Sequence, residues 1–241
     1  MITLQWLGQS GFYLCTEQGT AVMIDPYLTD TISKGYRPYI HERLLKPVMV
    51  IEEIPRLDAV LYTHHHMDHM DPNTVTRILW HTEAFITASP YVCEEHLGKS
   101  IHVPEHRMKP LEPGETLVLE DMHITATYAN HCQGALGFLV QTQGKTLYFS
   151  GDTQLFYDMK ELGEKHKIDC AFLCFNGQGG NMDISSAVQA AKALRAECIV
   201  PVHYGMYADN TADPGLFEFA LKKSSPEIRF IRPEPGEIFR I

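Results

Sequence analysis

Three histidines and an aspartate, set at fixed spacing, are the residues of this sequence best suited to metal chemistry. His64, His66, Asp68 and His69 form the pattern His-x-His-x-Asp-His directly after the apolar run 59–63. Alternate side chains of an extended segment share a face, so His64 and His66 can bind one ion together. Asp68 and His69 lie where the chain turns toward a predicted helix, within reach of a second ion. Imidazole and carboxylate ligands suit Zn, Mn or Fe, and the absence of thiolates disfavours a purely structural zinc site.

Further candidate ligands follow strand patterns elsewhere in the chain. His131, Asp152 and His203 each come just after a predicted strand. The carboxyl ends of strands are where α/β proteins tend to place their sites. Taken singly, a residue of this kind is more often a hydrogen-bonded loop or core residue than a metal ligand. Together they supply enough ligands for two metal ions.

The elements that must position these residues can be read from the apolar periodicity. Strands are predicted at 2–7, 12–15, 21–24, 59–63, 115–120, 123–128, 136–142, 146–150, 169–175, 198–202 and 228–231, and helices at 74–80, 185–196 and 214–222. The first half is rich in strands and the second alternates strand and helix, with no repeat or break in composition. We therefore expect a single domain over 1–241. The irregular stretch 26–56 is typical of a cover over an active site.

Composition narrows the classes of partner. The chain has 241 residues, 44% of them hydrophobic and 21% charged, as in an ordinary globular protein. A formal charge of −10 argues against a nucleic-acid polymer or an anionic membrane as partner, because both require a basic face. No apolar run reaches the length of a membrane span, and the N-terminal residues lack signal-peptide character. We expect a cytoplasmic protein with a small-molecule substrate. Whether it forms a homo-oligomer is left open.

Over nearly its whole length the chain resembles the metallo-β-lactamase fold superfamily. The resemblance rests on Asp25 after its strand, the histidine block at 64–69, and the later His131, Asp152 and His203. The segments 150–152, 169–171 and 199–204 look most like the L-ascorbate-6-phosphate lactonase-like branch. The chain departs from the lactonases proper in its shorter length and in the histidine at 131. The substrate of those enzymes therefore does not carry over directly.

The resemblance implies a fold and a set of roles. The expected fold is α/β (α+β), a four-layer αββα sandwich with a dinuclear site along one edge. His64, His66 and His131 would hold one ion, Asp68, His69 and His203 the other, and Asp152 would bridge the two. Asp25 would steady the histidine loop from behind.

The expected chemistry is hydrolysis assisted by two divalent ions, Zn or Mn. Such a pair lowers the pKa of a water held between them, so that hydroxide can attack an ester, lactone, amide or phosphoester. Asp68 is the candidate catalytic residue, placed to orient the nucleophile and pass on its proton. For substrate binding we single out Arg37 and Lys34, from a basic cluster that also includes His41, Arg43 and Lys46, together with Tyr204 and Asn176.

The sequence is also compatible with two other functions. The same site could hydrolyse a small or cyclic phosphodiester, since nuclease relatives share the fold. A protein of a different class, a non-catalytic metal-binding module, would keep the ligands without turnover. The leading hypothesis is a metal-dependent hydrolase of a small anionic ester or lactone.

Overall fold

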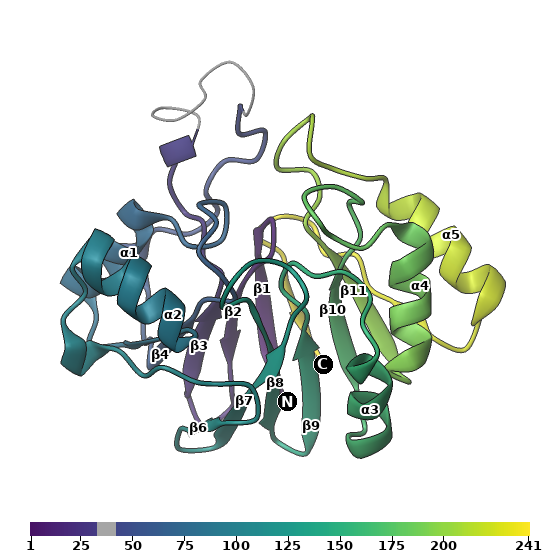
Figure 1. Ribbon diagram of the computed structural model, residues 1–241, viewed down its shortest axis with the longest axis horizontal. Helices are drawn as coiled ribbons and strands as arrows, with labels where there is room; N and C mark the ends of the chain where they lie inside the picture. Colours follow the sequence, from purple (N-terminus) through teal and green to yellow (C-terminus); the bar gives the residue numbers. More distant parts are fainter. Residues whose placement is uncertain (33–41) are drawn as a thin grey trace.

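The computed structural model describes residues 1–32 and 42–241, and it has two β-sheets packed face to face between two groups of helices (Figure 1). The strands are β1 (Thr3–Gly8), β2 (Gly11–Cys15), β3 (Ala21–Ile24), β4 (Ala59–Leu61), β5 (Phe85–Thr87), β6 (Thr116–Val118), β7 (Met122–Tyr128), β8 (Leu136–Thr142), β9 (Lys145–Phe149), β10 (Cys170–Cys174), β11 (Cys198–Val202), β12 (Arg229–Phe230) and β13 (Ile238–Arg240). The α-helices are α1 (Pro72–His81), α2 (Pro90–Val92), α3 (Asp158–Lys165), α4 (Ile184–Ala193) and α5 (Pro214–Ser224). The described residues also form the 3-10 helices η2 (Ile51–Glu53) and η4 (Glu105–Arg107) and the π-helix η3 (Cys93–Ile101).

Both sheets are mixed. The first has the order β13-β1-β2-β3-β4-β5, antiparallel up to β3 and parallel from β3 to β5. The second has the order β12-β11-β10-β9-β8-β7-β6, parallel from β12 to β9 and antiparallel from there to β6. Because β7 and β9 both run antiparallel to β8, their carboxyl ends lie at the same edge. The expected four-layer αββα sandwich is confirmed.

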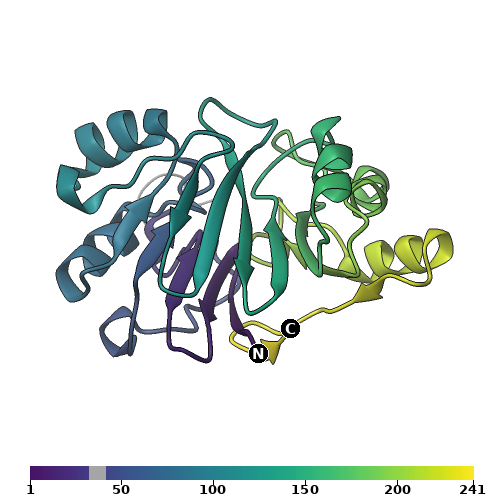
Figure 2. The same ribbon diagram turned by 90° about the horizontal axis from the view of Figure 1, so that it is seen from below.

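Strands of the first sheet alternate between two apolar cores. In β3, Val22 and Ile24 lie in the large core between the sheets, whereas Met23 packs in a second core beneath α1 and η3. In β4, Leu61 faces the first core and Val60 the second. Strands buried on both faces read as continuous apolar runs, which is why their period of two was hidden in the sequence. Figure 2 shows the two groups of helices on either side of the strands.

Three helices, α1, α4 and α5, begin at a capping aspartate. The Asp71 carboxylate accepts hydrogen bonds from the backbone amides of Asn73 and Thr74 at the start of α1, while Asp183 and Asp213 cap α4 and α5. Asp71 also accepts from the hydroxyls of Thr29 and Thr31, both at 2.6 Å. The helix start therefore ties the end of the histidine loop to the segment after β3.

The sequence predicted most elements but not all. The helices expected at 74–80, 185–196 and 214–222 are α1, α4 and α5, and the strands expected around them are present. The strands β5 and β13 and the helices α2, η3 and α3 were not predicted. The two missed strands have three residues each, too few to show a period, and α3 buries only Met159 and Gly163. Part of the predicted cover 26–56, residues 33–41, lies outside the described residues.

Candidate metal centre

The predicted ligands meet at one edge of the sandwich, where strands of both sheets end. His64–His69 follow β4 and Asp25 follows β3 in the first sheet, while His131, Asp152 and His203 follow β7, β9 and β11 in the second. Several of these loops turn sharply, because Asp25 and His203 have positive φ angles of 43° and 64°. A backbone held in this region by a non-glycine residue is a feature that clusters at functional sites.

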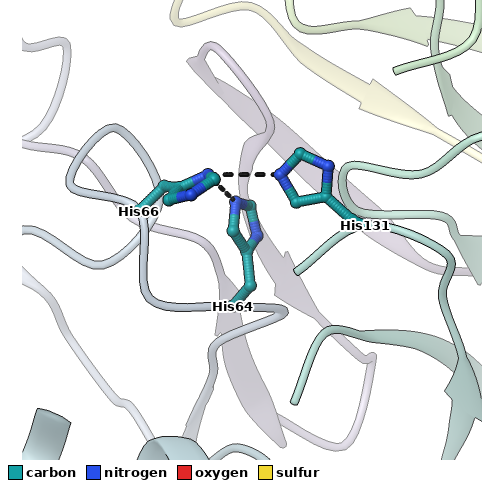
Figure 3. Close-up of side chains that lie close together, drawn as sticks. All are labelled: His64, His66 and His131. Atoms are coloured by element: carbon teal, nitrogen blue, oxygen red, sulfur yellow. Dashed lines mark hydrogen bonds between the residues drawn. The ribbon is translucent and has the colours of Figure 1, made fainter. Parts of the chain in front are cut away.

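The first donor group consists of His64, His66 and His131. The Nε2 of His64 lies 3.0 Å from the Nδ1 of His66, and the Nε2 of His131 lies 3.2 Å from the same atom. Figure 3 shows the three rings turned toward one another. Burial lowers the pKa of all three imidazoles. They are therefore neutral at physiological pH, which is the form that binds metal.

The second donor group consists of Asp68, His69 and His203. The Oδ2 of Asp68 lies 3.8 Å from the Nε2 of His69 and 3.4 Å from that of His203. Burial alone would lower the pKa of each imidazole, but Asp152 and Asp68 raise both values, to about 9 for His203. Burial alone would raise the pKa of the Asp68 and Asp152 carboxyls, but His69 and His203 hold both pKa values below the usual range. His69 and His203 therefore keep the half-buried Asp68 and the buried Asp152 ionised.

Asp152 stands between the two groups. Its Oδ1 lies 3.3 Å from the Nε2 of His69, and its Oδ2 lies 3.1 Å from the Nε2 of His203 and 3.9 Å from that of His131. The Nε2 of His69 and the Oδ1 of Asp152 are buried and have no hydrogen-bond partner among the described residues. Buried polar atoms are otherwise almost always paired, so these two fit an ion as their common partner. The ligand atoms of each group lie within 4.8 Å of one another, and the mixed imidazole and carboxylate set suits a divalent transition metal.

Asp25 holds the histidine loop from behind. Its carboxylate accepts hydrogen bonds from the Nδ1 of His69 at 2.8 Å and from the backbone amide and hydroxyl of Thr63 at 2.8 and 2.6 Å. The Thr63 hydroxyl in turn lies 3.0 Å from the Nδ1 of His64. With the Nδ1 of each ring occupied in this way, the Nε2 atoms of His64 and His69 face the centre.

Two amide side chains contact the carboxylates, and sequence analysis missed both. The Nε2 of Gln9, in the turn between β1 and β2, donates to the Oδ2 of Asp68 at 2.7 Å and lies 3.1 Å from the Nε2 of His203. The Nδ2 of Asn181 donates to the Oδ2 of Asp152 at 2.8 Å. A glutamine or an asparagine in a glycine-containing turn carries no periodic signal that would mark it.

The structure describes only some of the residues predicted to bind substrate. Lys34 and Arg37 lie outside the described residues, and so does His41 of the same cluster. The Oδ1 of Asn176 accepts from the Nδ2 of Asn181 at 2.9 Å, which connects it to Asp152. Tyr204 is buried, with its ring stacked on that of Trp6 at 5.0 Å and tilted against that of Phe175 at 5.7 Å.

Arg43, of the basic cluster, braces the segment that follows β3. Its guanidinium donates to the backbone carbonyls of Tyr27, Thr29 and Leu45, and it lies 4.4 Å from the centre of the Tyr27 ring. The side chain thereby joins residues before and after 33–41.

Replacing Gly151 with alanine is expected to destabilise the fold by about 2–4 kcal/mol, the sum of a strained backbone and overpacking. Gly151 has φ 57°, and a Cβ there would lie 2.7 Å from the Cβ of Thr63. The measurement is chemical denaturation of both proteins. Gly144→Ala is the matched control, because Gly144 has φ 73° and a Cβ there would have no atom of the described residues within 4 Å. Equal losses in the two variants would contradict the close approach of Thr63.

Removing the Gln9 amide is expected to lower turnover and metal affinity about 10–100-fold, the usual effect of losing a group that orients a ligand. The test compares Gln9→Ala with Gln143→Ala by kinetics and by metal competition. Gln143 has the same residue type and a φ of 50°, against 52° for Gln9, but lies in the turn between β8 and β9. Equal behaviour of the two variants would show that the contact with Asp68 has no role.

The fold and the two donor groups define the class of protein, the metal-dependent hydrolases with a metallo-β-lactamase fold. The family model described as "Beta-lactamase superfamily domain" matches residues 20–204, and the chain belongs to this superfamily. It is 31% identical, over 99% of both chains, to a UPF0173 metal-dependent hydrolase of Pyrobaculum arsenaticum.

Solved structures agree with this assignment. A metallo hydrolase of Ignicoccus hospitalis superposes with a TM-score of 0.79 at 26% identity, covering 100% of this chain and 99% of that one. The isothiocyanate hydrolase from Delia radicum gut bacteria shares the fold, with a TM-score of 0.78 at 19% identity over 99% and 98% of the two chains. Within residues 1–32 and 42–241, no helix combines the length and apolar character that a membrane crossing requires.

Proposed function

We propose that the protein is a hydrolase that uses two divalent cations, Zn or Mn, to cleave a small anionic ester or lactone. The observation that carries this proposal is the position of Asp152, whose two oxygens reach ring nitrogens of both donor groups. A carboxylate that spans two neighbouring ligand sets is the arrangement that a two-metal hydrolytic site requires. The alternative of a metal-binding module without catalysis gives no reason for such a shared carboxylate.

His64, His66 and His131 would hold one cation, and Asp68, His69 and His203 the other, with Asp152 shared. The chemistry that the pair supplies is Lewis acidity, toward water and toward a carbonyl or phosphoryl oxygen. Asp68 then has a second role, because Gln9 fixes one of its oxygens by a 2.7 Å hydrogen bond. We assign to Asp68 the orientation of the attacking water and the acceptance of its proton. Asn181 keeps Asp152 in position through its 2.8 Å hydrogen bond.

The substrate class rests on resemblance and charge. Residues 150–152, 169–171 and 199–204 resemble the L-ascorbate-6-phosphate lactonase-like branch, which supports a lactone or ester as substrate. An anionic group on that substrate would pair with the basic cluster of 34–46, in which we assign the contact to Lys34 and Arg37. Asn176 and Tyr204 are proposed as further contacts, Asn176 through the amide chain that leads to Asp152.

The experiment that tests this function is one side-by-side assay of purified protein reconstituted with Zn or with Mn. The substrates are L-ascorbate 6-phosphate, simple lactones and an activated phosphodiester, and Asp68→Ala serves as the inactive control. Lactone turnover that disappears in Asp68→Ala supports the proposal. Phosphodiester turnover without lactone turnover would replace it with a phosphodiesterase. Bound cations with no turnover on any of these substrates would favour a metal-binding module.

A further inference from the structure

A third donor group, formed by His65, His66 and Cys132, lies beside the metal centre. One ligand atom from each of these residues lies within 4.8 Å of the others. The Sγ of Cys132 and the Nδ1 of His65 are 3.7 Å apart. His65 and Cys132 are half-buried and His66 is exposed, whereas His64 and His69 are fully buried. Solvent therefore reaches this group before it reaches the buried ligands.

The separation of the Cys132 Sγ and the His65 Nδ1 fits two ligands of a tetrahedral zinc site. Zn–N bonds of about 2.0–2.1 Å and a Zn–S bond of about 2.3 Å, at a tetrahedral angle, place the nitrogen and the sulfur roughly 3.6 Å apart. The observed 3.7 Å also suits a thiol–imidazole hydrogen bond. The position of His66 favours the metal site. A ligand atom of His66 lies within 4.8 Å of ligand atoms of both His65 and Cys132, and a thiol–imidazole hydrogen bond does not require this third donor.

The ring of His65 and the backbone just after Cys132 are both closely packed. The ring of His65 stacks on that of His96 with centroids 4.0 Å apart and an angle of 12° between the planes. Two residues beyond Cys132, Gly134 packs so closely that a Cβ there would lie 2.5 Å from the Oγ of Ser89. Donors fixed in this way lose little conformational freedom on binding a ligand.

His66 connects this group to the metal centre. Its Nδ1 faces His64 and His131, at 3.0 and 3.2 Å, and the same side chain belongs to the group with His65 and Cys132. An imidazole ring has two nitrogens that can serve as ligands. An exposed side chain that belongs to both groups is placed to move a cation from the outer one to the inner one.

We propose that His65 and Cys132, with His66 as the shared ligand, form a binding site for a thiophilic divalent cation of the Zn²⁺ class at the edge of the metal centre. Binding forms a sulfur–metal bond, and the Cys132 thiol releases its proton to solvent, with no change of oxidation state. The site captures the cation from solvent, ahead of the buried ligands. It goes beyond the proposed hydrolytic function and does not depend on the identity of the substrate.

Cobalt reports directly on sulfur ligation, because a thiolate ligand gives Co²⁺ an intense near-ultraviolet charge-transfer band. Full-length protein freed of metal by a chelator is titrated with Co²⁺, while absorbance and bound metal per chain are measured. The band is expected in the wild type, lost in Cys132→Ser, and displaced by added Zn²⁺. His65→Ala, a second variant, is expected to lose it too. The matched control is Cys15→Ser, because Cys15 is another half-buried free thiol but has Arg56 and Asp58 as its charged neighbours.

Absence of the band in the wild type, its survival in Cys132→Ser, or its loss in Cys15→Ser would overturn the proposal and leave a thiol–imidazole hydrogen bond. Circular dichroism and melting curves establish that each variant is folded. The outcome is separable from that of the proposed function. Turnover without a thiolate band rejects this site alone, and a thiolate band without turnover rejects the hydrolase alone.

Discussion

Asp152→Asn is expected to lower the rate of hydrolysis by at least about a thousandfold, since a two-metal site contributes several kcal/mol and each 1.36 kcal/mol is tenfold. Asparagine keeps the shape of the side chain but has one acceptor oxygen and no charge. The two contacts of 3.1 and 3.3 Å to His203 and His69 involve different oxygens of Asp152, so one of them must fail. Kinetic assays and metal analysis of the purified variant measure the loss of rate and of bound cation together.

The matched control for this substitution is Asp169→Asn. Asp169 is also a buried carboxylate, but it lies just before β10 and pairs with Lys145 at 2.9 Å. The control is expected to lose stability while keeping both cations and turnover. An Asp152→Asn variant with unchanged metal content and turnover would show that Asp152 is not shared between two cations.

Chelation is expected to abolish hydrolysis completely and reversibly and to lower the melting temperature. Cations that bind only the native state stabilise it by about 2.7 kcal/mol when present at 100 times their Kd. For a chain of this size that corresponds to roughly 5–10 °C. The physical reason is that the Asp152 carboxylate repels that of Asp68, and a bound cation offsets this repulsion.

Melting curves with and without chelator, followed by re-addition of Zn or Mn, check this expectation. His64→Ala is the comparison, because a variant that has lost a buried ligand of the first donor group responds less to the chelator. A melting temperature that does not change on chelation would contradict cation binding by the two donor groups.

The candidate ligands that the sequence indicated meet at one edge of the sandwich, but the sequence indicated little of what holds them there. The spacing of His64, His66, Asp68 and His69 follows from local geometry, because one strand and one turn position all four. Asp152 and His203 could be found because each comes directly after an apolar strand. Gln9 and Asn181 could not, since their contacts with Asp68 and Asp152 arise only when distant turns meet.

The same distinction applies to the fold. Long or strongly apolar strands such as β8 and β10 are marked by their composition, and α1 by the Asp71-Pro72 start. Helix α3 buries only two residues, and β5 is fixed by pairing with β4 rather than by any pattern of its own. Tertiary contacts decide such elements, and one sequence does not display them.

The candidate ligands come from both sheets: His64–His69 follow a strand of the first, and His131, Asp152 and His203 follow strands of the second. A cation bound by these residues would therefore cross-link the two halves of the sandwich in the native state. Any sliding of one sheet over the other changes the distances between ligands. Metal affinity in this protein is therefore expected to depend on how the two sheets pack against each other. Substitutions in the core between the sheets are expected to change metal affinity even when they do not contact the metal centre.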